Sequence, residues 1–222
     1  LQAKLERQLP HVKESFLLQL VQGYLFAYSE DDLRERMKHY NWDVDDCTFV
    51  VAYIRLTGFT LLEGRFSQGD EGLVTFAAVN MIEEMSARRF AQSDVLNFHD
   101  LSAGLFLAVP GTEDLGRELR ALAEELTQAI NQLLKLRVTI VIGRPTRQIA
   151  HIPHLFEEAK QVIGYRMFER NNQIIEMERY DRTESPTDIR YPFALEREIV
   201  EALRTGREQE TIDGLEAFLE AL

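Results

Sequence analysis

Two short runs rich in β-branched and aromatic residues constrain the fold most strongly. They are residues 47–56 (CTFVVAYIRL) and 136–143 (LRVTIVIG), and each has about the length of one buried strand. Apolar residues at helical spacing lie before, between and after these runs. Because two such strands cannot shield their own faces from water, we expect amphipathic helices to cover the sheet that they form.

The segments between and after these strands predict the remaining elements. Residues 94–99 and 103–109 predict a hairpin, with Gly104 near its turn. Helices are expected over residues 73–89, 112–134 and from Pro153 onward, and a last strand over residues 173–177. The expected buried positions of the first two helices are Leu73, Phe76, Ala77, Met81 and Met85, then Leu115, Leu119, Leu122, Leu126, Ile130 and Leu133. The predicted fold class is α+β, a mostly antiparallel sheet covered by helices.

The first 27 residues carry a helical stripe of large apolar side chains. Pro10 predicts a break, with a second helix that begins there and ends at Gly23, and Ser29 predicts the N-cap of a third helix. Two interpretations of the stripe remain open: it packs on its own domain, or residues 1–9 continue an upstream dimeric coil while residues 11–22 dock on the core. The stripe consists of Leu1, Leu5, Leu9, Val12, Phe16 and Leu20.

The last 42 residues differ in character from the middle of the chain. Residues 181–190 are polar and contain Pro186, which predicts a linker, and Gly206 separates two helical patterns that predict a hairpin. We therefore expect three parts: an N-terminal helical connector at 1–44, an α+β domain at 45–180, and a linker with a helical hairpin at 181–222. Both ends of the chain fall in helical patterns, which favours a segment of a longer protein.

Charge and cysteine content narrow the range of functions. The chain has 25 basic and 37 acidic residues, a formal charge of −12, so direct binding to a phosphate backbone is not expected. No apolar run reaches the roughly 18 residues that a membrane helix requires. The single cysteine, Cys47, cannot form an internal disulfide, which favours a reducing, cytoplasmic location.

No catalytic, cofactor-binding or metal-binding residue is assigned from the motifs. His151 and His154 are separated by three positions, but no third metal ligand lies nearby in the sequence. Arg144 and Arg147 form the only small basic cluster next to a turn, a weak anion site at best. Cys47 precedes an apolar strand and is expected to be a core residue. No phosphate-binding loop or nucleophile elbow is present.

Several segments of the sequence resemble those of a known family. Residues 138–145 (VTIVIGRP) and 154–168 (HLFEEAKQVIGYRMF) resemble a strand and the helix after it in GGDEF-type domains. Residues 5–23 and 191–222 resemble the flanking helices of the degenerate GGDEF-like middle domain in large AraC-family bacterial transcriptional regulators. The resemblance implies a GGDEF-like, nucleotidyl-cyclase-like sheet, an upstream sensor or receiver domain that can carry a membrane anchor, and a downstream DNA-binding domain.

The resemblance also allows the cyclase residues to be compared by position. It places the GGDEF signature over residues 101–105, with Ala103 and Gly104 at the two acidic positions. It places Arg55 and Thr57 at the aspartates of the first-strand motif. Cyclase chemistry needs carboxylates there to hold divalent metal against a triphosphate. The resemblance therefore implies that this domain is not an enzyme and needs no cofactor.

The expected function is a non-catalytic signal-relay and dimerisation module of a DNA-binding transcriptional regulator. We expect a homodimer that contacts DNA only through a domain outside these residues and makes no direct contact with a membrane. The alternative is a small-molecule or nucleotide-binding sensor domain without turnover.

Overall fold

The computed structural model describes residues 2–58, 69–111, 114–165 and 172–179, and nine residues between 199 and 215; residues 2–10 and 164–165 are described by their main chain only. The chain forms two compact units, residues 1–180 and residues 181–222. No helix in the described part is long and apolar enough to cross a membrane.

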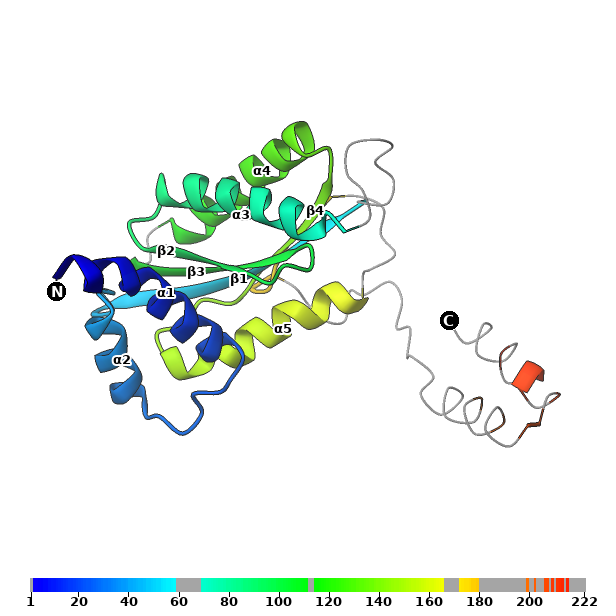
Figure 1. The fold of residues 1–222 in the computed structure, drawn as a ribbon, viewed down its shortest axis with the longest axis horizontal. Coiled ribbons are helices and arrows are strands. Elements are labelled where there is room, and N and C mark those ends of the chain that lie inside the picture. The colour runs from blue at the N-terminus through cyan, green and yellow to red at the C-terminus, as the bar shows by residue number, and fades with distance from the viewer. Residues whose placement is uncertain are drawn as a thin grey trace. The chain divides into compact units, whose positions relative to one another are not determined.

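The larger unit contains a five-stranded sheet in the order β2-β3-β1-β4-β5 (Figure 1). The central strand β1 (Cys47–Thr57) pairs antiparallel with β3 (Ser102–Pro110) and with β4 (Arg137–Ile142). Strand β2 (Ser93–Asn97) pairs antiparallel with β3, and β5 (Gln173–Glu176) is parallel to β4. The predicted fold class, a mostly antiparallel sheet covered by helices, is confirmed.

Helices cover both faces of this sheet (Figure 1). One core lies under α3 (Glu71–Ala87) and α4 (Leu115–Leu133). The other lies under α1 (Gln2–Val21), α2 (Glu30–His39) and α5 (Ile152–Tyr165), which follows the 3₁₀ turn η2 (Ile149–His151). Successive β1 side chains enter opposite cores, which explains why this strand is apolar throughout.

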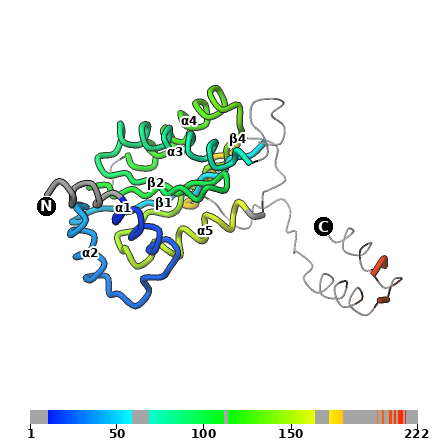
Figure 2. Tube along the Cα trace, viewed as in Figure 1, coloured from blue at the N-terminus to red at the C-terminus, as the bar shows by residue number. Residues whose placement is uncertain are grey.

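Helix α1 runs without interruption through Pro10, so the predicted break at that residue is wrong. Proline removes one main-chain hydrogen bond but fixes a helical φ, and the later turns of α1 are anchored in the core. Phe16, Leu17, Leu20 and Val21 are buried there, whereas Val12 is 41% exposed. Residues 11–22 therefore dock on the core of their own domain, which both interpretations of the stripe expect. In Figure 2 the docked part of α1 is blue and the preceding turns are grey.

The buried face of α3 differs from the predicted one. Leu73 and Phe76 are 63% and 54% exposed, while Val74, Ala78 and Ile82 are buried. Almost every side of this helix carries apolar residues, so their spacing alone does not identify the inward face. In α4 the predicted stripe is buried except for Leu133, which lies exposed in the last turn. Helix α4 begins at Leu115; residues 112 and 113, where the start was predicted, lie outside the described residues.

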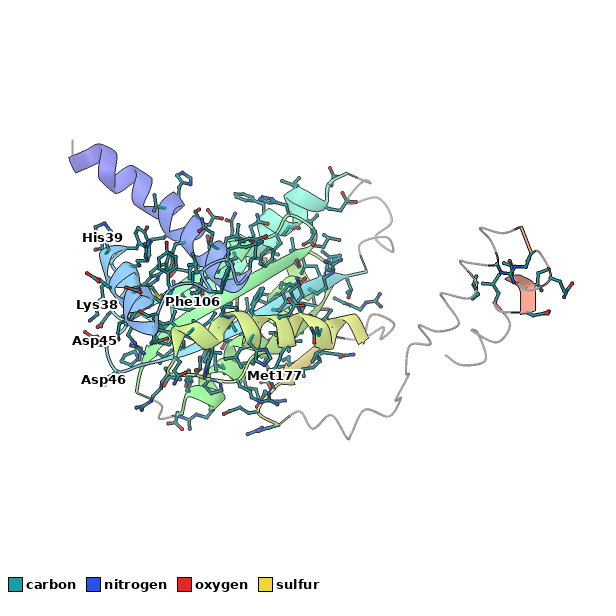
Figure 3. The ribbon with its side chains drawn as sticks, turned by 90° about the horizontal axis from the view of Figure 1, so that it is seen from below. Lys38, His39, Asp45, Asp46, Phe106 and Met177 are labelled. Carbon is teal, nitrogen blue, oxygen red and sulfur yellow. The ribbon has the colours of Figure 1, made fainter. Side chains whose placement is uncertain are left out.

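Helix α2 begins as the sequence predicts. The Ser29 hydroxyl accepts from the Asp32 amide. The Asp32 carboxylate accepts from the Ser29 hydroxyl and from the Ser29 amide, and these two hydrogen bonds lower the pKa of Asp32. Lys38 Nζ lies 2.6 Å from Asp45 Oδ1 beside the end of this helix (Figure 3). The Glu30 carboxylate accepts from the amides of Ile149 and Ala150 at 3.0 and 2.9 Å, and so connects α2 to η2, the turn that precedes α5.

The smaller unit is described only in part. The predicted linker at residues 181–190 lies outside the described residues. Ile199 and Ala202 are helical and buried, Gly206 forms a turn at φ 67°, and residues 211–213 are helical again.

Candidate functional site

The β2–β3 hairpin brings together the positions that the sequence comparison singled out. Arg55 pairs with Ser102 across β1 and β3, and Leu56 donates its amide to the Leu101 carbonyl at 2.8 Å. His99 and Leu101 have φ values of 60° and 65° in the turn. Gly104 lies in β3, two residues after its first residue Ser102, and so near the turn as predicted. The hairpin end of the sheet is therefore the candidate site.

An internal ion pair occupies this end of the sheet. Arg55 Nη1 donates to the Asp100 carbonyl at 2.8 Å and lies 3.5 Å from Asp100 Oδ2. The Ser102 hydroxyl also donates to the Asp100 carboxylate. Asp100, the acidic residue nearest to the aligned positions in sequence, is thus engaged by its own neighbours. Within the described ranges, no group of three His, Cys, Asp or Glu side chains could hold a metal ion.

Gly104 lies against aromatic side chains. A Cβ at this position would lie 3.1 Å from Phe156 Cε2 and 3.4 Å from Phe98 Cε2, closer than ordinary van der Waals contact for the first. A carboxylate side chain at this aligned position would have to displace Phe156. The close packing of α5 against β3 therefore requires a residue without a side chain at position 104.

A cavity of about 500 Å³ lies beside the hairpin. Three walls come from the end of α1, from the hairpin and from the first half of α5. Its apolar part includes Tyr53, Phe98 and Phe156, whose ring centroids lie 5.7 to 6.3 Å apart. This volume is within the range of small-molecule sites.

A second cavity of about 250 Å³ lies at the other end of β1, beside the start of α4. Thr48 lines it, and the Thr48 hydroxyl is buried with no hydrogen-bond partner among the described residues. One ordered water satisfies a hydroxyl of this kind, so this cavity alone does not indicate a ligand.

The structure does not bring the other sequence candidates together into a site. His154 Nε2 lies 3.7 Å from Glu158, whereas His151 lies in η2. Arg144 pairs with the same Glu158 at 3.2 Å, and Arg147 uses its carbonyl to accept from Arg34. The weak anion site considered for the arginine pair thus has one of its two cations already neutralised.

Cys47 is a core residue, as predicted. Its side chain is buried in the cluster under α1, α2 and α5. Burial, with the nearby carboxylates of Asp43 and Asp45, raises the pKa of the Cys47 thiol. The thiol also donates to the Asp43 carbonyl at 3.4 Å. A raised pKa keeps the sulfur protonated and weakly nucleophilic.

Sequence reasoning missed the aromatic cavity. Tyr53, Phe98 and Phe156 each fit the apolar pattern of their own element, and no short motif connects them. Only the tertiary arrangement places them together. The one local signal was Gly104 within a strand, because a strand glycine often marks a close approach by another element.

Comparison with known proteins is consistent with this architecture. The family model described as GGDEF-like domain matches residues 26–165, more than half of the 222-residue chain. No curated protein matches the chain.

Proposed function

Since the chain belongs to the family of GGDEF-like domains, we propose that it is a non-catalytic signal-relay and dimerisation module. The resemblance of its flanking segments favours a place in an AraC-family transcriptional regulator, between an upstream sensor or receiver and a DNA-binding domain. In this proposal, DNA is contacted by that other domain, because the −12 chain has no excess of basic residues to release counterions.

The main support for a non-catalytic role is the Arg55–Asp100 ion pair at the hairpin. A guanidinium at the first aligned position repels a divalent cation, and the nearby carboxylate is already bound to it. Ala103 and Gly104 supply no carboxylate at the other aligned positions. Metal-assisted attack on a triphosphate therefore lacks its ligands at this place.

The contacts of α1 support the relay part of the proposal. The Asp94 carboxylate, in β2, accepts from Trp42 Nε1 at 2.7 Å and lies 3.7 Å from Lys13 Nζ. Lys13 lies over the Trp42 ring at 4.4 Å, and Phe16 packs against the same ring. A displacement of α1 therefore acts directly on the strand that leads into the hairpin.

The second candidate, a sensor that binds a small molecule without turnover, is favoured by the cavity of about 500 Å³ beside the hairpin. Direct titration with a ligand distinguishes it from a relay that responds only to its neighbours in the chain.

Incubation with GTP and magnesium or manganese is expected to yield no cyclic di-GMP. The reason is the missing carboxylates at Arg55, Thr57, Ala103 and Gly104. Chromatography of the reaction mixture against a no-protein control makes the measurement. Product above that control would contradict the non-catalytic proposal.

Replacing Leu5 with aspartate is expected to shift the protein from dimer to monomer without changing its melting temperature. Leu5 belongs to the part of α1 that precedes the docked residues. A leucine side chain that becomes fully buried in a dimer contact favours association by roughly 1.5–3 kcal/mol. Sedimentation over micromolar concentrations measures the oligomeric state.

The matched control is Leu133→Asp, which changes an exposed leucine on the opposite face of the sheet. It should leave the dimer unchanged. Equal sedimentation of wild type and Leu5→Asp would remove the dimer contact from α1 and with it the proposed entry point of the signal.

A further inference from the structure

The cavity beside the hairpin has a phenol in its apolar wall. Tyr53 is 7% exposed and lines the cavity together with Phe98 and Phe156. A tyrosine at such a place presents an apolar ring and a hydroxyl that can donate or accept a hydrogen bond. Tyr53 thus offers a directional contact next to the tilted rings of Phe98 and Phe156.

The rim of the cavity carries one acidic and one basic side chain, which form only a weak ion pair with each other. Glu157 and Lys160 both line it from α5, with Lys160 Nζ 3.7 Å from Glu157 Oε2. Both side chains are about half exposed, so their mutual attraction is weak and screened by water. Each of them can therefore pair with an opposite charge on a ligand at little cost.

The third charged group of the lining is not available in the same way. Asp100 already accepts from Ser102 and pairs with Arg55. The charges left for a ligand are one carboxylate and one ammonium, side by side above an aromatic wall.

We propose that this cavity binds a small aromatic zwitterion, a ring that bears a neighbouring ammonium and carboxylate, as in an aromatic α-amino acid. The ring packs on Phe98 and Phe156 with the Tyr53 hydroxyl at its edge, the ammonium pairs with Glu157, and the carboxylate pairs with Lys160. A nucleotide is disfavoured, since Glu157 would repel its phosphates and Lys160 is the one cationic side chain among the described residues of the lining.

Such a ligand would touch the elements through which the relay is proposed to work. Val21 and Tyr24 at the end of α1, Phe98 in the hairpin and Glu157 in α5 all line the same cavity. Binding would therefore fix the position of α1 relative to the hairpin. The ligand site goes beyond the relay proposal and does not depend on the absence of turnover.

Calorimetric titration of the whole chain with L-phenylalanine tests the proposal. We expect saturable binding with a Kd below about 1 mM. 2-Phenylethylamine lacks the carboxylate and 3-phenylpropionate lacks the amine, so each should bind about tenfold more weakly. L-Alanine, which lacks the ring, should show no binding.

Two variants test whether the ligand binds in this cavity. Tyr53→Phe keeps the ring packing and should weaken binding about threefold to tenfold, and Glu157→Gln should weaken it about tenfold. Glu35→Gln removes one charge from the exposed face of α2, away from the cavity, and should bind as wild type does. Unchanged melting temperatures of the variants show that the fold is retained.

Three results would overturn the proposal: no saturable binding of L-phenylalanine, equal affinity for 3-phenylpropionate, or unchanged affinity in both Tyr53→Phe and Glu157→Gln. Binding of GTP in place of L-phenylalanine would make the occupant a nucleotide and also overturn it. The titration reports neither oligomeric state nor turnover, so its failure leaves the relay proposal standing.

Discussion

Phe16→Asp is expected to lower the free energy of unfolding by about 4 kcal/mol or more. Phe16 is 6% exposed, and its ring lies 5.4 Å from that of Tyr40 and 5.9 Å from that of Trp42. The substitution removes these contacts and places a carboxylate in an apolar cluster. Urea denaturation followed by tryptophan fluorescence measures the change, because Trp42 is the only tryptophan.

Val12→Asp is the matched control, one turn earlier on the same helix. Val12 is 41% exposed, and its replacement should cost less than about 1 kcal/mol. If Phe16→Asp were no more destabilising than Val12→Asp, the docked part of α1 would contribute little to the fold.

Gly143→Ala is expected to destabilise the domain by about 2–4 kcal/mol. A Cβ on Gly143 would lie 2.7 Å from the Val51 carbonyl oxygen, a separation that real Cβ atoms essentially never show. The main chain cannot move away easily, because the Gly143 amide donates to that same oxygen at 2.8 Å. Thermal and urea unfolding of the purified variant measure the loss.

Gly116→Ala provides the comparison within the same domain. Gly116 lies in the first turn of α4, and a Cβ there meets nothing within 4 Å. This change should be neutral or stabilising by up to about 1 kcal/mol, since alanine favours helix more than glycine. Equal stability of the two variants would show that Val51 and Gly143 are not packed this closely.

The strands and the fold class could be predicted from the sequence because β1 and β4 are buried on both faces. Burial on both sides requires β-branched and aromatic residues at nearly every position, a pattern that few loops share. Helix α4 could also be predicted from the sequence, because its leucines repeat at helical spacing and its other face is charged.

The wrong predictions concern features that tertiary packing determines and that local sequence patterns do not. Pro10 has a helical φ, so the docked turns after it decide whether the helix continues. Leu73 and Val74 are equally apolar, and only the position of the sheet determines which of them is buried. In the hairpin turn, His99 and Leu101 take left-handed conformations although neither residue is a glycine.

The candidate site was less predictable than the fold. Arg55 and residues 101–105, which the resemblance singled out, lie at the same end of the sheet, where β1 meets β3 and the turn before it. The ion pair of Arg55 with Asp100 and the aromatic cavity depend on side chains from separate elements, which no spacing in the sequence reveals.

Hydrogen exchange in Asp94→Ala tests the central claim, that α1 and the hairpin are energetically coupled. The variant removes the acceptor of the buried Trp42 indole N–H and the partner of Lys13. We expect the amides of residues 16–21 in α1 to exchange about fivefold faster or more, although the substitution lies in β2. Asp45→Ala, which removes only an exposed pair with Lys38, should leave them unchanged. Unaltered exchange of the α1 amides in Asp94→Ala would contradict the relay.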